Sequence, residues 1–290
     1  MKKKLFLLGA LCFGYVSFAQ TNAQIQNKKG VDLMPKAGDF AIGFNAVPVL
    51  TYIGDLFGSG QPNLALGGNK FVSPFAANTL FGKYMLTDNQ AIRAHLRIGV
   101  FNNTYSNLVD DNGQDDPVFE VTDELKTSNS IYNIGAGYEW RRGTTRLRGL
   151  YGGELFFQHS TGLQSEYKYG NAITEGNNFP TSTVWSDFGD VIDEVPVIER
   201  IMDSKGGKYT GIGLRAFAGV EYFFAPKICV GTEFGWGASM GKTSERTTKK
   251  QFWNPITTSI TEGKNNTAGS SQLRVDTDNF NGSIYLMFYF

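Results

Sequence analysis

The chain has 290 residues and carries 27 basic and 27 acidic side chains, so its formal net charge is zero at pH 7. This balance gives no electrostatic reason to expect a nucleic-acid partner. With 35 glycines, 23 phenylalanines and 13 tyrosines against 9 prolines, the composition is typical of an all-β protein with many short strands, either a membrane barrel or a soluble β-sandwich.

Residues 1–19 have the features of a secretory signal peptide. Three lysines at positions 2–4 precede an apolar run over residues 5–18, and the small residues Ser17 and Ala19 predict cleavage before Gln20. A lipoprotein reading would use Cys12, but Leu11 is too bulky for that processing site. No later apolar run is long enough for a transmembrane helix, so an integral protein would have to be a β-barrel.

Eight segments alternate between apolar and polar residues with period two, as half-buried strands do. They cover residues 39–50, 76–86, 91–103, 130–141, 146–158, 209–224, 228–241 and 278–290. The connections alternate in length: turns at 87–90, 142–145 and 225–227 are short, whereas segments 51–75, 104–129, 159–208 and 242–277 are long and polar. Short turns on one rim and long loops on the other are typical of bacterial outer-membrane barrels.

The last strand ends on an aromatic residue and has one apolar face, formed by Ile284, Leu286, Phe288 and Phe290. An unpaired strand of this kind would invite aggregation. We therefore expect it to pair with the first strand, near Asp39, and to turn its apolar face to lipid. Tyr285, Met287 and Tyr289 would then face inward.

Together, these features resemble a small outer-membrane β-barrel of the OmpA/OmpX type, over roughly residues 39–290. The resemblance implies an eight-stranded antiparallel up-and-down transmembrane barrel with long extracellular loops and both termini in the periplasm. The apolar face of the last strand is similar to the signal read by the barrel-assembly machinery, which would be a partner during biogenesis, beside outer-membrane lipid and lipopolysaccharide. Residues 20–38 would be a flexible periplasmic segment or partly an extension of the first strand, and no peptidoglycan-binding domain would follow the barrel.

Charged side chains recur on the faces opposite the apolar stripes, so they would converge on the barrel interior. An eight-stranded barrel is only wide enough for side chains to fill it, and unpaired charges could not persist there. We therefore expect a mutually paired interior network, with a gated polar path as the alternative. Its predicted members are Lys83, Arg93, His95, Arg97, Glu139, Arg141, Arg148, Glu154, Arg215, Glu221 and Glu233.

Candidate chemistry is sparse. The adjacent pair His159 and Ser160 would lie at the membrane edge, where an imidazole could deprotonate a hydroxyl, but adjacent strand residues point to opposite faces. The acidic segment 110–116 suits a divalent cation in composition and departs from calcium-loop spacing, so a solvated loop is favoured. Without zinc-type spacing or a nucleotide-binding glycine pattern, we expect no metal and no cofactor.

The longest loop contains an apolar pattern that predicts a short helix over residues 193–203. Pro196 suits the first turn of a helix, and Ile198, Ile201 and Met202 would form one apolar stripe. This stripe would fold over the barrel mouth, or else contact a partner protein or the membrane surface. Loops 159–208 and 242–277 are the predicted partner-binding segments.

The sequence therefore favours a non-enzymatic outer-membrane barrel that works through its long loops, as a structural or interaction protein and an accessory subunit of a larger outer-membrane complex. Three alternatives remain open: a small gated channel, an outer-membrane lipid-modifying enzyme that uses His159 or Ser160, and a soluble secreted β-sandwich.

Overall fold

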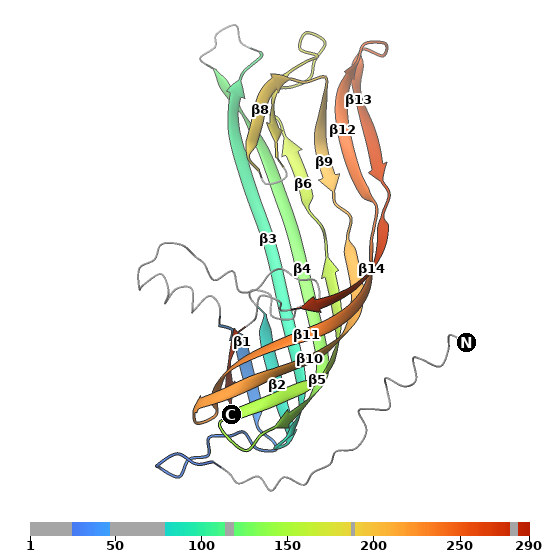
Figure 1. The fold of residues 1–290 in the computed structure, drawn as a ribbon. Coiled ribbons are helices and arrows are strands. Elements are labelled where there is room, and N and C mark those ends of the chain that lie inside the picture. Colours follow the sequence, from blue (N-terminus) through green and yellow to red (C-terminus); the bar gives the residue numbers. More distant parts are fainter. Residues whose placement is uncertain (1–24, 47–78, 114–118, 187–188, 279–283) are drawn as a thin grey trace, which may run out of the picture.

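A computed structural model describes residues 25–46, 79–113, 119–186, 189–278 and 284–290 (Figure 1), and every regular element in these ranges is a β-strand. All of the pairings between these strands are antiparallel. The predicted all-β antiparallel architecture is therefore confirmed. Within the described ranges, no helix is long and apolar enough to cross a membrane.

Eight strands pair in a cycle that returns to its start. Each of β1 to β5 pairs with the next, β5 pairs with β10, β10 with β11, β11 with β15, and β15 with β1. The cycle is uneven, because β1 and β15 have 6 residues each whereas β4 has 23. The members are β1 (Phe40–Asn45), β2 (Leu80–Thr87), β3 (Gln90–Asp110), β4 (Glu120–Arg142), β5 (Leu147–Ser160), β10 (Tyr209–Ala225), β11 (Ile228–Thr243) and β15 (Ile284–Tyr289).

The two ends of this cycle differ. The short connections β2–β3, β4–β5 and β10–β11 lie at one end, here called the turn end, and the carboxy terminus lies there too (Figure 1). At the opposite end, the loop end, β3 and β4 run on unbroken and the sheet gains further strands. These are β6 (Gln164–Lys168), β9 (Glu199–Lys205), β12 (Arg246–Asn254) and β13 (Ser259–Thr267), beside a separate hairpin of β7 (Thr181–Trp185) and β8 (Val191–Pro196).

The prediction of long loops at 104–129, 159–208 and 242–277 was therefore wrong, because most of these residues are in strands. β6 pairs with β4, β9 with β6, and β12 with β9 and β13, while β14 (Ser270–Asp278) pairs with the loop-end half of β11. Apart from Leu273 and Val275 of β14, these strands show little of the apolar alternation by which strands are found in a sequence. The predicted loop at 51–75 lies outside the described residues.

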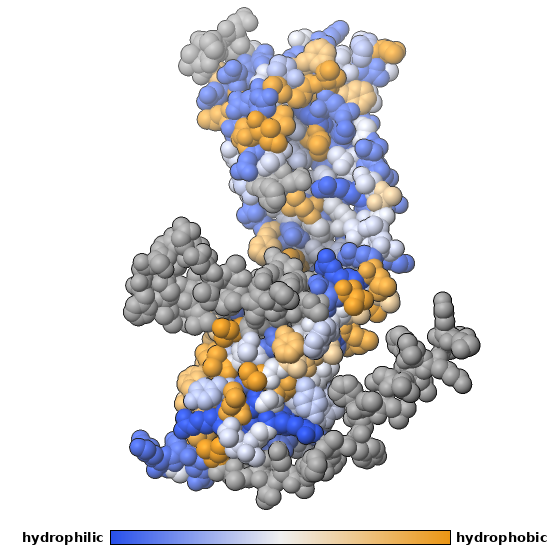
Figure 2. Space-filling model, in the orientation of Figure 1, coloured by the Kyte–Doolittle hydropathy of each residue, from blue (hydrophilic) through white to orange (hydrophobic). Residues whose placement is uncertain are grey.

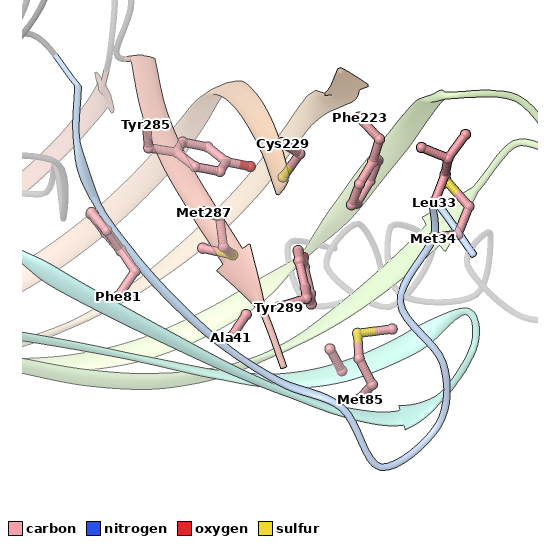
Figure 3. Packing of buried hydrophobic residues seen from close by; sticks show 11 residues of the cluster. Leu33, Met34, Ala41, Phe81, Met85, Phe223, Cys229, Tyr285, Met287 and Tyr289 are labelled. Atoms are coloured by element: carbon pink, nitrogen blue, oxygen red, sulfur yellow. The ribbon is translucent and has the colours of Figure 1, made fainter. Parts of the chain in front are cut away.

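The segment before β1 closes the turn end. Leu33 and Met34 are buried against Met85, Phe223 and Tyr289 in one apolar cluster, which Figure 3 shows at close range. The backbone holds this segment in place, since the Lys227 amide donates to the Leu33 carbonyl at 3.0 Å and the Gly38 amide to the Met85 carbonyl at 2.8 Å. The expectation of a flexible lead is therefore wrong for residues 25–38, whereas residues 1–24 lie outside the described ranges.

Burial in the cycle strands is the reverse of that in an ordinary soluble domain. Figure 2 shows hydrophobic side chains on the outside of the lower half of the molecule. Leu214 is 63% exposed and Leu155 59%, whereas Arg215 and Glu154 next to them in sequence are buried. Because successive strand residues point to opposite faces, the cycle strands turn an apolar face outward, and six of the eight also carry buried charged side chains on the inward face.

Candidate functional site

The inward faces of six strands bring eight charged side chains together in the interior, here called the charge cluster. All eight are buried, and four positive groups balance four negative ones. Each lies within 4 Å of an opposite charge, as buried ions require if they are to keep their charge. The members are Lys83, Arg93, Arg141, Arg215, Glu139, Glu154, Glu221 and Glu233.

Glu221 organises the turn-end half of the cluster. Lys83 Nζ lies 2.7 Å from Glu221 Oε1 and 2.7 Å from Glu139 Oε2, and Arg141 donates to Glu221 Oε2. The two inward tyrosines of β15 complete the site, since the Tyr285 hydroxyl donates to Oε1 at 3.0 Å and the Tyr289 hydroxyl to Oε2 at 3.2 Å. Glu221 thus accepts from four side chains on three other strands.

Glu233 organises the loop-end half. Arg93 donates to it through both terminal nitrogens, at 3.0 and 3.1 Å, and Arg215 does so at 2.7 Å. Arg215 also donates to Glu154 at 3.2 Å, and Arg93 Nε lies 3.3 Å from that carboxylate. A further contact of 3.5 Å between Arg93 and Glu139 joins the two halves, so the cluster is continuous.

Three predicted members lie at the margin. His95 is buried at the loop-end side, where Nε2 is 3.1 Å from Asn133 Oδ1 and Nδ1 is 3.9 Å from Glu154. Arg148 instead donates to Asn89 Oδ1 at 3.3 Å, near the turns. Arg97 is half-buried further along β3 and lies outside the cluster. The structure therefore brings nine of the eleven predicted residues together.

Two interior phenylalanines were missed. The Arg93 guanidinium lies 4.0 Å from the centre of the Phe217 ring, and the Arg141 guanidinium lies 5.7 Å from that of Phe223. Both rings share the inward face of β10 with Arg215 and Glu221, so strand alternation alone would have found them. Gly152 leaves room for the Phe217 ring, because a Cβ on this residue would lie 2.7 Å from the nearest ring carbon.

His159 and Ser160 form hydrogen bonds with different strands. His159 Nδ1 lies 2.9 Å from Thr210 Oγ1, whereas Ser160 Oγ donates to Asn129 Oδ1 at 3.2 Å. The two side chains therefore engage different partners. Of the acidic segment, Asp110–Gly113 is described, and residues 114–116 lie outside the described ranges. Among the described residues, no group of three or more His, Cys, Asp and Glu side chains is placed to hold a metal ion.

The predicted helix over residues 193–203 was also wrong. This stretch is the end of β8, a short connection and most of β9, because pairing of β9 with β6 and β12 prevails over the helical pattern. Ile198 is 73% exposed in the connection, whereas Ile201 and Met202 are half-buried in β9. The three residues therefore form no common stripe.

Polar contacts fix the chain around β9. Tyr169 donates its hydroxyl proton to the Ile201 carbonyl at 2.9 Å, and burial raises the pKa of Tyr169, which keeps that donor protonated. The Arg200 guanidinium lies 4.7 Å from the centre of the Tyr169 ring and donates to the Asn171 carbonyl at 2.7 Å. This part of the loop end is therefore a packed structure.

The carboxy-terminal strand β15 closes the cycle by pairing with both β1 and β11. Leu286 pairs with Phe44 and Val230, and Phe288 with Ile42 and Ile228. Ile284 pairs with Thr232 at the other end of β15. The Phe290 ring, which is 59% exposed, stacks on Phe40 with centroids 5.1 Å apart. Recognition of this strand by assembly machinery stays a prediction.

No protein-family model and no curated protein matches the sequence. Among solved structures, the chain is similar to the outer membrane protein OprG from Pseudomonas aeruginosa, at 12% identity over 89% of this chain and 98% of that one, with a TM-score of 0.28.

Proposed function

We propose that the mature chain is an integral outer-membrane protein, in which the cycle β1–β5, β10, β11 and β15 spans the bilayer as an eight-stranded up-and-down barrel. The observation that carries this proposal is the reversed burial of the cycle strands. Buried Arg and Glu side chains face apolar side chains across the backbone, and about half the surface of Leu214, Ile212 and Ile98 is exposed. An apolar outer face of this kind is stable when it is in contact with lipid.

The extent of the outward apolar face fits a bilayer. On β4, alternate outward positions run from Trp140 to Tyr132, which is roughly 27 Å along the strand at about 3.4 Å per residue. The apolar band of outer-membrane barrels is about 25 Å tall and has aromatic residues at both edges. Trp140 stacks on Tyr151, with centroids 5.8 Å apart, at the turn-end edge.

We propose further that the protein is not an enzyme and acts through its loop end as a structural or interaction protein, as an accessory subunit of a larger complex. The charge cluster supports a closed interior, because it is buried and each of its charges lies within 4 Å of an opposite charge. The loop-end strands β6–β9, β12 and β13 offer a large, mostly polar surface for a partner. These strands lie within the predicted partner segments 159–208 and 242–277.

Fractionation of cells tests the membrane proposal. We expect the mature chain to co-sediment with outer membranes, and to migrate faster on a gel when unheated than when boiled, as closed barrels do. Recovery in the periplasm or medium, without a heat-dependent shift, would exclude it. Purification in mild detergent followed by mass spectrometry tests the subunit proposal, and a strictly monomeric species without a co-purifying protein would contradict that part alone.

A further inference from the structure

A row of outward-facing side chains marks the loop-end edge of the apolar band. Across five adjacent strands, β4, β5, β10, β11 and β14, the register places Tyr132, His159, Thr210, Lys242 and Ser271 side by side. The neighbouring outward row toward the turn end is entirely apolar: Ile134, Phe157, Ile212, Met240 and Leu273. The outer surface thus changes from apolar to polar between two consecutive rows.

The polar row contains a compact cationic site. Lys242 is opposite Thr210, and Lys208 lies two residues before Thr210, opposite Ser244. The Lys208 amide donates to Ser244 Oγ at 2.9 Å, which fixes the backbone there. Lys208 and Lys242 are therefore diagonal neighbours, with backbones about 7–8 Å apart.

Both ammonium groups are available. The two lysines are exposed and form no ion pair within the described part of the chain. The acidic residue nearest to Lys242 in sequence is Glu245, which directly follows Ser244. His159, whose Nδ1 is 2.9 Å from Thr210 Oγ1, adds a ring on the other side, and its centroid lies 6.3 Å from that of Tyr132.

We propose that Lys208, Lys242, Thr210 and His159 form a binding site for the phosphate-bearing headgroup of an anionic membrane lipid. Two ammonium groups and a hydroxyl suit phosphate oxygens. The adjoining apolar residues Ile212 and Met240, both more than half exposed, would contact the acyl chains of the same molecule. Soluble inorganic phosphate has no apolar part that could contact these two residues. The inference rests on the proposed membrane function, because only then does this row lie at the lipid headgroups.

The test compares two double variants of the mature chain in mild detergent. Lys208→Gln/Lys242→Gln removes the site, and Lys168→Gln/Lys264→Gln makes the same charge change on β6 and β13. Lys168 is opposite Glu124, eight residues beyond Tyr132 and so roughly 27 Å further along the strands, which exceeds the screening length of about 8–10 Å. A heat-dependent gel shift is measured first, because its absence would count against the proposed function and not against this site.

Native mass spectrometry then follows titration with phosphatidylglycerol, lipopolysaccharide, phosphatidylcholine or inorganic phosphate. We expect phosphatidylglycerol or lipopolysaccharide to bind the wild type and the control variant, and to bind Lys208→Gln/Lys242→Gln about tenfold to thirtyfold more weakly. Whichever of phosphatidylglycerol and lipopolysaccharide binds more tightly identifies the lipid class. Binding by the wild type should also weaken as salt is raised, which tests the site even if the variant does not fold.

Three results would overturn the proposal. One is equal binding of the anionic lipids to both double variants, and another is wild-type binding that does not respond to salt. The third is inorganic phosphate binding as tightly as the lipids, which would make the site one for soluble anions.

Discussion

Glu221 is the residue on which the interior depends most. It accepts from Lys83, Arg141, Tyr285 and Tyr289 and is fully buried. Removal of its charge would take a close counter-ion from Lys83 and Arg141, which are both buried. We expect Glu221→Gln to lower the free energy of unfolding by about 3–5 kcal/mol, the usual cost of breaking a buried ion pair on one side.

Urea unfolding of the folded protein in detergent measures this loss. The control is Glu262→Gln on β13, where the side chain is exposed and a small change is expected. Equal midpoints for the two variants would show that the charge cluster does not stabilise the barrel.

For single residues, the sequence predicted well which side chains face inward, but it predicted poorly which inward side chains contact one another. Alternation along each strand suffices to place Glu221 and Arg215 inward, because it needs no partner strand. Whether an inward charge joins the cluster depends on the register between strands, which a single strand does not encode. For this reason Arg148 and Arg97 face inward but lie outside the cluster, whereas Phe217 could have been found from the alternation of β10 alone.

Among the elements, the segment before β1 has a clear structural role. Leu33 is 1% exposed, and its carbonyl accepts from the β10–β11 turn, while the Ala37 amide donates to Asp88 in the β2–β3 turn at 2.9 Å. The segment thus ties together turns on both sides of the β1–β15 junction. Val31, two residues away, is 50% exposed and provides a matched control.

We expect Leu33→Asp to destabilise the folded protein by several kcal/mol, about the cost of burying an unpaired charge in an apolar site. Val31→Asp should have little effect, because that side chain is already half in solvent. Loss of the compact, unheated gel band with rising temperature measures both. A similar melting temperature for the two variants would contradict a closing role for Leu33.

The β7–β8 hairpin depends on one buried carboxylate. Asp123, on β4, accepts from the Gly170 amide at 2.8 Å and from the Thr183 amide at 2.7 Å. Asp123→Ala removes the acceptor of the buried Thr183 amide, at a cost of about 1–3 kcal/mol, and also that of the more exposed Gly170 amide. We expect faster proteolytic cleavage in residues 169–198 for Asp123→Ala than for the neighbouring Glu124→Ala. Equal cleavage rates would mean that other contacts hold the hairpin.

The loop-end elements also show where a sequence reading fails. Residues 193–203 combine a proline with helically spaced apolar residues, so the local pattern favours a helix. In the structure, backbone pairing with β6 and β12 decides the outcome, and such long-range pairing leaves no periodic trace when both faces of a strand are polar. The cycle strands were predictable because their two faces meet different surroundings.

For the whole molecule, membrane insertion is the property to test. Leu214 is 63% exposed and lies in register with Leu155 and Ala136, midway along the apolar band of β4, whereas Ile256 is 91% exposed at the tip of the β12–β13 hairpin. Leu214→Arg places a charge in the bilayer, which costs about 2–4 kcal/mol at the midplane, whereas Ile256→Arg should cost little. Folding yield into phospholipid vesicles measures the difference, and equal yields would contradict a bilayer around β10.

A closed interior is the second property of the whole molecule. Because the charge cluster is balanced and Leu33 and Met34 cover its turn end, we expect no stable conductance steps in planar bilayers, with a general porin as the positive control. Stable steps that disappear when Arg97 or Glu154 is changed would instead support the gated-path alternative.

The unbroken hairpin of β3 and β4 has a mechanical consequence. Paired residues continue without a register shift from Gln90 and Trp140 at one end to Asp110 and Glu120 at the other, so there is no hinge where the strands leave the apolar band. From Tyr132 to Glu120 the strand rises roughly 40 Å. If the cycle spans a bilayer as proposed, a partner bound at this tip would be held at a fixed height above the membrane, and a pull on that partner would be transmitted through β3 and β4 to the other strands of the cycle.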